Sequence, residues 1–178
     1  MYLETERLIL RRMEDGDFED WCAFPMEPDW WRMMGTDPLN TREEAREGFD
    51  WLMVHEKRFY AMVLREKGRC VGYLIVKNFP PVGELPELHG KTGRSLTFCV
   101  SRDYRRRGLA AEAITATVKY LFDVRQVDYV NSGYFDFNEP SRRLHEKLGF
   151  QPVTTTEVTL PDGETTTAIE TVLFNPNK

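Results

Sequence analysis

Cysteine is scarce in this sequence: there are three among 178 residues, and they lie far apart. Cys22, Cys70 and Cys99 form no CxxC pair and share no zinc-ligand spacing with a histidine. Neither a disulfide scaffold nor a bound metal is therefore expected. Isolated, reduced thiols favour a cytoplasmic protein.

Long apolar runs and an excess of basic residues are also missing. No stretch approaches the roughly 18 uncharged apolar residues that a membrane-spanning helix needs. Residues 1–7 carry charges where a secretion signal carries an apolar segment, so we expect neither a leader nor a membrane partner. Lysine and arginine number 24 against 29 aspartates and glutamates, a net charge of -5. This balance argues against broad nucleic-acid binding, which needs a basic surface.

The composition is that of a folded domain. Hydrophobic residues make up 41% of the chain and aromatic residues 12%, which excludes a disordered chain, a collagen and a coiled coil. The length fits a single domain over residues 1–178.

Hydrophobic periodicity predicts an α/β (α+β) sandwich with a mixed, mainly antiparallel sheet flanked by helices. Thr41 and Glu44 form a capping-box pattern that opens one helix, and Asn138 opens another. Segments 25–38 and 78–94 lack periodicity and are expected to be irregular. In the order β-α-α-β-β-β-α-β-α-β-β, the expected elements are 7–13, 17–24, the helix from 41, 59–64, 70–76, 95–100, the helix from 108, 128–135, the helix from 138, 153–160 and 166–174.

Residues 104–110 combine a basic turn with the start of an amphipathic helix. A helix start offers unpaired backbone N–H groups and the positive end of a dipole, which together form an anion site. Gly108 and Ala110 are small enough for phosphate oxygens to approach the backbone, and several donors in a row suit a pyrophosphate. The alternatives are that residues 102–107 form a solvated loop, with Gly108 in a tight turn, or that they contact RNA.

The segment Arg105-Arg106-Arg107-Gly108-Leu109-Ala110 resembles the (Arg/Gln)-x-x-Gly-x-(Gly/Ala) motif of the GNAT acetyltransferases. The resemblance runs nearly end to end and points to the branch that contains the ribosomal-protein alanine N-acetyltransferases. Four motifs in the right order are a specific signal. Glu112-Ala113 follows the first motif, and the other three matching segments are the opening Thr5-Glu6-Arg7-Leu8-Ile9-Leu10-Arg11, Asn138 with Ser141, and Glu146-Lys147-Leu148-Gly149-Phe150.

The resemblance implies that acetyl-CoA lies where the strand before the motif splays from the following strand. The pantetheine arm would pair with that strand's backbone and the pyrophosphate with the amides of the turn. Asn138 would hydrogen-bond the pantetheine arm or CoA, and a backbone N–H near Cys99 would stabilise the oxyanion. The residues implied to contact the cofactor are Phe98, Cys99, Val100, Arg105, Arg106, Arg107, Gly108, Leu109, Ala110, Asn138 and Ser141.

The proton donor departs from the family pattern. Many members carry tyrosine four residues before the glycine of the last motif, where this sequence has His145. Ser141 corresponds to the donor candidate of the resembling branch, and the i, i+4 spacing puts both residues on one helix face. A histidine near its reference pKa of about 6.5 is a competent acid near neutral pH. The alternatives are that Ser141 completes the helix cap and that His145 lies on the surface.

The general base is less clear. The resembling branch often has glutamate at the start of the strand before the motif, where this sequence has Ser95. The candidates are Glu84, Glu87, His89 and Asp136, each of which is otherwise a solvated loop residue.

The acceptor site would form between segment 25–38, the helix after Thr41 and segment 78–94. Trp30, Trp31, Met33 and Met34 would line it, together with Glu84, Glu87 and Asp136. The alternative for the tryptophans and methionines is that they fill the core or a dimer contact.

The resemblance therefore implies direct acetyl transfer from acetyl-CoA to a primary amine, through a ternary complex. The amine acceptor would be a protein N-terminus or a small molecule. The missing strand glutamate and the tyrosine-to-histidine exchange favour an alternative, a non-catalytic acyl-CoA-binding module. An RNA-contact domain is a further alternative. No nucleic-acid partner and no metal are expected, and a homodimer is left open.

Overall fold

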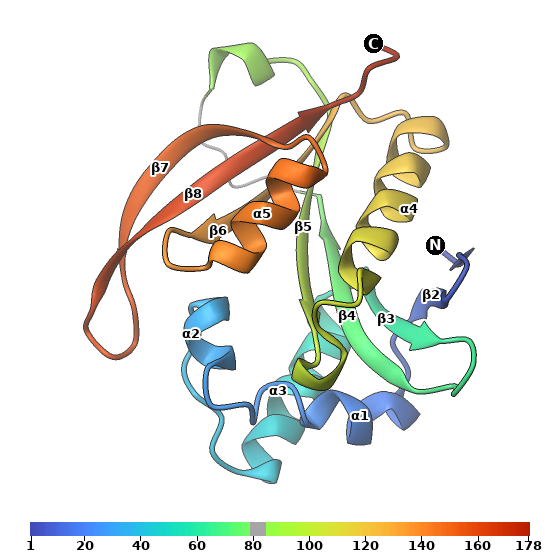
Figure 1. Ribbon diagram of the computed structural model, residues 1–178, viewed down its shortest axis with the longest axis vertical. Helices are drawn as coiled ribbons and strands as arrows, with labels where there is room; N and C mark the ends of the chain where they lie inside the picture. Colours follow the sequence, from blue (N-terminus) through green and yellow to red (C-terminus); the bar gives the residue numbers. More distant parts are fainter. Residues whose placement is uncertain (79–84) are drawn as a thin grey trace. The chain divides into compact units, whose positions relative to one another are not determined.

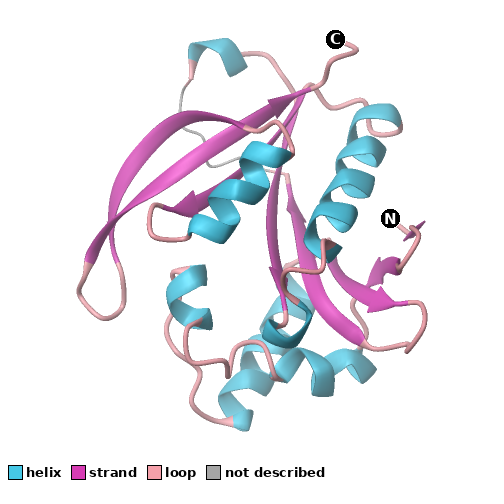
Figure 2. Cartoon of the chain, viewed as in Figure 1, coloured by secondary structure: helices cyan, strands magenta, loops and turns pink. Residues whose placement is uncertain are grey.

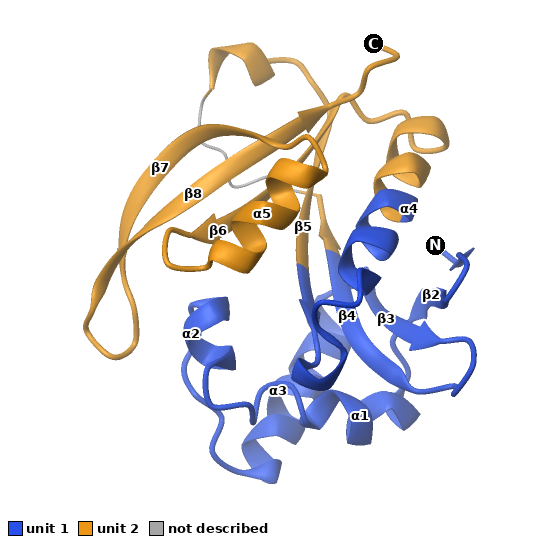
Figure 3. Cartoon of the chain, in the orientation of Figure 1, with its two compact units in different colours: residues 1–75, 98–116 blue, residues 76–97, 117–178 orange. Residues whose placement is uncertain are grey.

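The computed structural model of the protein describes residues 1–78 and 85–178. These residues form two compact units, shown in different colours in Figure 3. The first unit contains residues 1–75 and 98–116, and the second contains residues 76–97 and 117–178. The single-domain organisation stays a prediction. No helix in the described ranges is long and apolar enough to cross a membrane.

The first unit holds the N-terminal strands and helices. Its strands β1 to β4 pair antiparallel in chain order, with one register shift between Met62 and Val63. Its elements, with β4, β5 and α4 continuing into the second unit, are β1 (Leu3–Glu4), β2 (Leu8–Arg12), α1 (Phe18–Cys22), α2 (Trp30–Met34), α3 (Arg42–His55), β3 (Phe59–Leu64), β4 (Cys70–Lys77), β5 (Gly93–Val100) and α4 (Leu109–Asp123).

Aromatic side chains form the centre of the first unit's core. Phe49 of α3 lies with its ring edge-on to Phe18, Trp21 and Phe59, at centroid distances of 5.4, 5.2 and 6.1 Å. Such edge-to-face pairs contribute about 0.5–1.5 kcal/mol each beyond the burial of their area. This packing fixes α1 and α3 against the strands of the unit.

The second unit is built on the last strands. The parallel pairing of β5 with β6 covers Gly93 to Ser95, and β6–β8 and β7–β8 are antiparallel. Asp128 accepts hydrogen bonds from the backbone and hydroxyl of Thr92 at 2.7 and 2.8 Å, which joins the starts of β5 and β6. The elements found only in this unit are β6 (Tyr129–Phe135), α5 (Glu139–Lys147), β7 (Gln151–Thr159) and β8 (Thr165–Phe174).

The predicted fold class is confirmed. In the described residues, eight strands follow the order β1-β2-β3-β4-β5-β6-β8-β7, and the order of helices and strands along the chain is the predicted one apart from an added strand, β1, and an added helix, α2 (Figures 1 and 2). The capping box of α3 is confirmed as well: the Glu44 backbone N–H donates to Thr41 Oγ1 at 3.1 Å, and the Thr41 N–H donates to Glu44 Oε2 at 3.2 Å.

Three local predictions differ from the structure. Segment 25–38 is not wholly irregular, because Trp30–Met34 forms helix α2, which ends at Gly35 with φ of 65°. The helix predicted over 17–24 is split into a 3-10 turn at Asp15–Asp17 and the short α1. A short strand, β1, precedes the first predicted strand and pairs with β2. Each difference lies in a stretch of about one helical turn or less, too short for periodicity to specify.

Candidate active site

The turn before α4 presents its backbone amides in a row. Arg106 and Gly108 have φ of 62° and 77°, so left-handed residues alternate along the turn. Such alternation is typical of a nest, a backbone arrangement whose successive N–H groups bind anions. Among the residues that the structure describes, no acceptor takes a hydrogen bond from the N–H groups of residues 106–110. The turn therefore fits a diphosphate.

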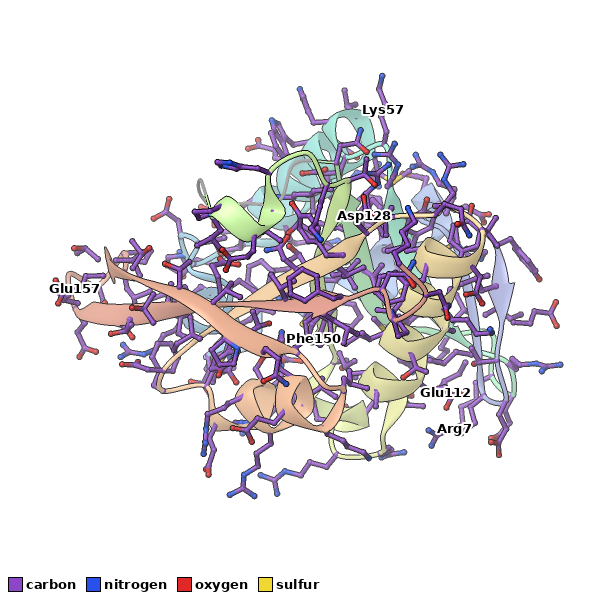
Figure 4. All side chains as sticks on the ribbon, turned by 90° about the horizontal axis from the view of Figure 1, so that it is seen from above. Arg7, Lys57, Glu112, Asp128, Phe150 and Glu157 are labelled. Atoms are coloured by element: carbon purple, nitrogen blue, oxygen red, sulfur yellow. The ribbon has the colours of Figure 1, made fainter. Side chains whose placement is uncertain are left out.

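A cluster of polar contacts holds this turn from the N-terminal side. Glu112, in the first turn of α4, accepts hydrogen bonds from Thr5 Oγ1 at 2.6 Å, the Arg7 N–H at 2.8 Å and Arg7 Nε at 2.7 Å. Arg7 Nη1 also donates to the Arg107 carbonyl at 2.7 Å, and Arg7 and Glu112 lie together in Figure 4. We call Thr5, Arg7 and Glu112 the turn anchor.

Electrostatics support the turn anchor. Burial by itself would raise the pKa of Glu112, but the hydrogen bonds from Thr5 and Arg7 together lower it below its ordinary value. The carboxylate is therefore ionised at neutral pH and keeps the turn in place. Thr5, Arg7 and Glu112 stood in the motifs that carry the resemblance, but sequence reasoning gave them no role. Glu112 lies more than 100 residues from Thr5 and Arg7 in the sequence, so no local pattern could indicate their contact.

The arginine side chains of the turn mostly bind the protein itself. Arg105 Nε donates to the Val100 carbonyl at 2.9 Å, and its guanidinium pairs with Glu27. Arg107 donates to the Asp103 carbonyl at 2.8 Å. These contacts engage the guanidinium groups of Arg105 and Arg107 within the protein, and the backbone amides of the turn are not used by them.

The end of β5 leads into this turn. Cys99 is buried, and burial raises the pKa of its thiol to about 12. The thiol is therefore protonated and inert at neutral pH, so only its backbone is available for chemistry. Gly72 of β4 packs against it: a Cβ at that position would lie 2.5 Å from the Cys99 carbonyl oxygen. Phe98 and Val100 flank it on the same strand.

In the second unit, Asn138 caps α5. The Ser141 N–H donates to Asn138 Oδ1 at 3.2 Å. Within the described ranges no acceptor takes a hydrogen bond from the Asn138 side-chain nitrogen. The cap role predicted for Asn138 is confirmed, and its amide N–H groups can serve a ligand.

His145 lies inside the second unit, with 2% of its surface exposed. The alternative that it is a surface residue is wrong. Its ring packs 5.1 Å from that of Tyr134 and 5.3 Å from that of Phe150, and its Nδ1 lies 2.8 Å from the Ser141 carbonyl oxygen and 3.4 Å from Ser141 Oγ. Burial lowers the pKa of His145, so the neutral imidazole predominates at pH 7.

The candidate base residues in the described part of the chain are exposed. Glu84 lies outside the described residues. Glu87 and His89 are exposed, in and after the 3-10 turn Pro86–Leu88. Asp136 is exposed after β6, and a hydrogen bond from Thr166 Oγ1 at 2.7 Å lowers the pKa of its carboxyl.

Trp30 and Trp31 belong to the core of the first unit. Trp30 is buried with Phe24, Tyr73 and Cys99, and Trp31 packs against the same cluster. Core packing is therefore a role for both tryptophans, and acceptor binding stays a prediction.

A model of the acetyltransferase (GNAT) domain family matches residues 7–151. The chain belongs to the GNAT acetyltransferase family. The resemblance stated from the motifs is confirmed, and the protein is an acetyl-CoA-dependent acetyltransferase. A prophage-derived uncharacterized N-acetyltransferase, YokL of Bacillus subtilis, is 43% identical over 151 residues, which are 84% of this chain and 78% of that protein.

Two solved acetyltransferase structures show the same fold. The ribosomal-protein-S5-alanine acetyltransferase from Vibrio fischeri aligns with a TM-score of 0.73 and 15% identity, over 99% of this chain and 98% of that one. The spermidine N-acetyltransferase from Vibrio cholerae, in complex with CoA and spermine, aligns with a TM-score of 0.76 and 13% identity, over 96% of this chain and 97% of that one. The mixed, mainly antiparallel architecture of the sheet is thus that of known acetyltransferases.

Proposed function

We propose that this GNAT protein transfers an acetyl group from acetyl-CoA directly to a primary amine, with both substrates bound at once. The observation that carries the proposal is the turn of residues 106–110, whose N–H groups have no partner in the described chain. Five amide donors beside the start of a helix match the two phosphates of CoA.

In this proposal, Arg105 to Ala110 hold the pyrophosphate through their backbone. The backbone of Phe98, Cys99 and Val100 pairs with the pantetheine arm, and Asn138 adds its side-chain amide. The Cys99 N–H stabilises the oxyanion that forms when the amine attacks the thioester carbonyl. One such donor contributes about 3–4 kcal/mol in enzymes that use this device.

Ser141 protonates the leaving thiolate of CoA. His145 acts through Ser141, because its imidazole lies against the Ser141 carbonyl and hydroxyl and is neutral at pH 7. A neutral, buried imidazole is better suited to orienting a hydroxyl than to donating a proton itself. His145 is thus a positioning residue in this scheme.

The acceptor is an ammonium-bearing molecule, either a protein N-terminus or a small amine. The names of the two structural relatives cover both classes, since one is named for a ribosomal-protein alanine and the other for spermidine. Glu87, Asp136, Trp30 and Trp31 remain candidates for contacts to it. A cytoplasmic location is part of the proposal and rests on the three cysteines, all free and buried.

Steady-state kinetics test the proposal. Release of the CoA thiol from acetyl-CoA is followed in the presence of one of three probe amines. The probes are spermidine, glucosamine and a tetrapeptide whose first residue is alanine. We expect turnover with at least one amine and intersecting lines when both substrates are varied. Parallel lines with an acetylated protein would contradict direct transfer. Binding of CoA without turnover of any amine would instead support the acyl-CoA-binding module.

A further inference from the structure

A carboxylate on β8 lies over the neighbouring strand β6. Glu170 is the register partner of Gly133, and Asn131 lies two residues before Gly133 on the same face of β6. The Asn131 side chain donates from Nδ2 to Glu170 Oε2 at 3.0 Å. Asn131 is fully buried, whereas Glu170 is partly exposed. Asn131 is therefore enclosed by the sheet, while the Glu170 residue is only partly covered.

Gly133 provides the space for this carboxylate. A Cβ at Gly133 would lie 2.9 Å from Glu170 Oε1 and 3.1 Å from its Cδ. On the other side, Glu170 pairs with Thr154 of β7, next to a register shift between Pro152 and Thr154. Such irregularities in a strand often occur beside active sites, where they redirect side chains.

The charge of this group is not balanced by a cation. Burial raises the pKa of Glu170, and the hydrogen bond from Asn131 opposes this only in part. No salt bridge to Glu170 is present among the described residues. An ionised carboxylate accepts hydrogen bonds only, so Asn131 must turn its nitrogen toward it. The Asn131 Oδ1 atom is then buried without a hydrogen-bond partner in the described chain.

In the described chain neither Glu170 Oε1 nor Asn131 Oδ1 accepts a hydrogen bond, so the pair can receive an ammonium group. A primary ammonium has three N–H donors and one positive charge, and burying an unpartnered polar oxygen costs about 1–3 kcal/mol. Of the carboxylates that sequence reasoning proposed as the base, the described ones, Glu87 and Asp136, are exposed. The sequence did not indicate Glu170 as a candidate base, because this residue lies in an ordinary strand pattern, far in sequence from Asn131 and Gly133.

We propose that Glu170 binds the ammonium group of the acceptor and takes its proton, and that Asn131 positions the Glu170 carboxylate. This inference rests on the proposed function. In the reaction, R–NH3+ gives one proton to Glu170 and becomes R–NH2, whose lone pair forms the new C–N bond with the acetyl carbon. The C–S bond breaks, Ser141 gives its hydroxyl proton to the CoA thiolate and takes up the second amine proton, and Glu170 returns its proton to water.

The variant Glu170→Gln tests the catalytic role. Glutamine keeps the shape and the acceptor for Asn131 but cannot take the proton. We expect kcat/KM for the amine to fall by about 10²–10⁴-fold, with CoA affinity and melting temperature unchanged. The matched control is Glu157→Gln, an exposed carboxylate on β7 labelled in Figure 4, which should keep full activity.

A double-mutant cycle tests Asn131. Asn131→Leu should lower kcat/KM about tenfold in the wild-type background and have no further effect when Glu170 is already glutamine. A structural role alone would give the same loss in both backgrounds. Melting curves identify any variant that fails to fold.

Two outcomes distinguish a failure of the role of Glu170 from a failure of the proposed acetyl transfer. Turnover by the wild-type protein together with full activity of Glu170→Gln would overturn this inference and leave the proposed function intact. A wild-type protein that binds CoA and acetylates none of the probe amines would overturn the proposed function, and the inference with it.

Discussion

The turn at residues 105–110 and the Asn131–Glu170 pair bind through different parts of the chain. The turn uses backbone amides of consecutive residues, so a short motif specifies it. The pair uses side chains from β6 and β8, and it depends on the register that places Gly133 opposite Glu170. A local backbone site can thus be read from a motif, whereas a site assembled across strands needs the sheet.

The two regions also differ in how they are held. The turn is exposed, and the neighbouring carboxylate Glu112 fixes it to the distant residues Thr5 and Arg7. The pair is fixed by the sheet itself, with Asn131 fully buried. Substitutions in the turn anchor should therefore weaken CoA binding, whereas substitutions of Asn131 or Glu170 should lower turnover.

The largest effect is expected from Gly108→Val. The position has φ of 77°, and its amide belongs to the proposed diphosphate site. We expect CoA affinity, measured by isothermal titration, to fall more than 100-fold, about 2.7 kcal/mol, while the protein stays folded.

Gly163→Val is the matched control, because Gly163 has φ of 84° and no atom within 4 Å of an added Cβ. Both variants carry the same backbone strain, roughly 1–2 kcal/mol. Equal CoA affinity in the two variants would contradict a diphosphate site at Gly108.

A smaller effect is expected from Glu112→Gln. Removing the charge weakens three hydrogen bonds from Thr5 and Arg7, so the turn becomes less ordered before CoA binds. Titration should show CoA affinity reduced about tenfold, or 1.4 kcal/mol.

Lys119→Gln is the control. It removes the exposed ion pair with Asp123 on the same helix, and such exposed pairs contribute little to stability. It should leave CoA affinity unchanged; a similar loss in both variants would point to α4 stability instead.

The smallest effect is expected from Asn138→Ala. Loss of this cap costs about 1 kcal/mol of stability, and the proposed CoA contact is lost as well, so affinity should fall about fivefold. Thr41→Ala removes the cap of α3 and should cost similar stability with no change in CoA binding. Chemical denaturation and titration compare the two. If Asn138→Ala lowers stability and leaves affinity intact, its role is limited to capping.

The sequence predicted most of the architecture, because caps and strand periodicity are local signals. Thr41 and Asn138 begin helices as predicted, and the strand order along the chain is confirmed. Helix α2 was missed because one turn of Trp-Trp-Arg-Met-Met carries too little periodicity. The burial of His145 was missed because a polar residue on a short helix resembles a solvated one, and only the packing of Tyr134 and Phe150 reveals its place.

The most direct test follows the backbone amides of the turn while CoA is added to the full-length protein. In ¹H–¹⁵N spectra, we expect the amide signals of residues 106–110 to shift most and to become protected from exchange with solvent as CoA saturates the protein. Saturation with these five signals unmoved would contradict the claim that this turn binds the diphosphate of CoA.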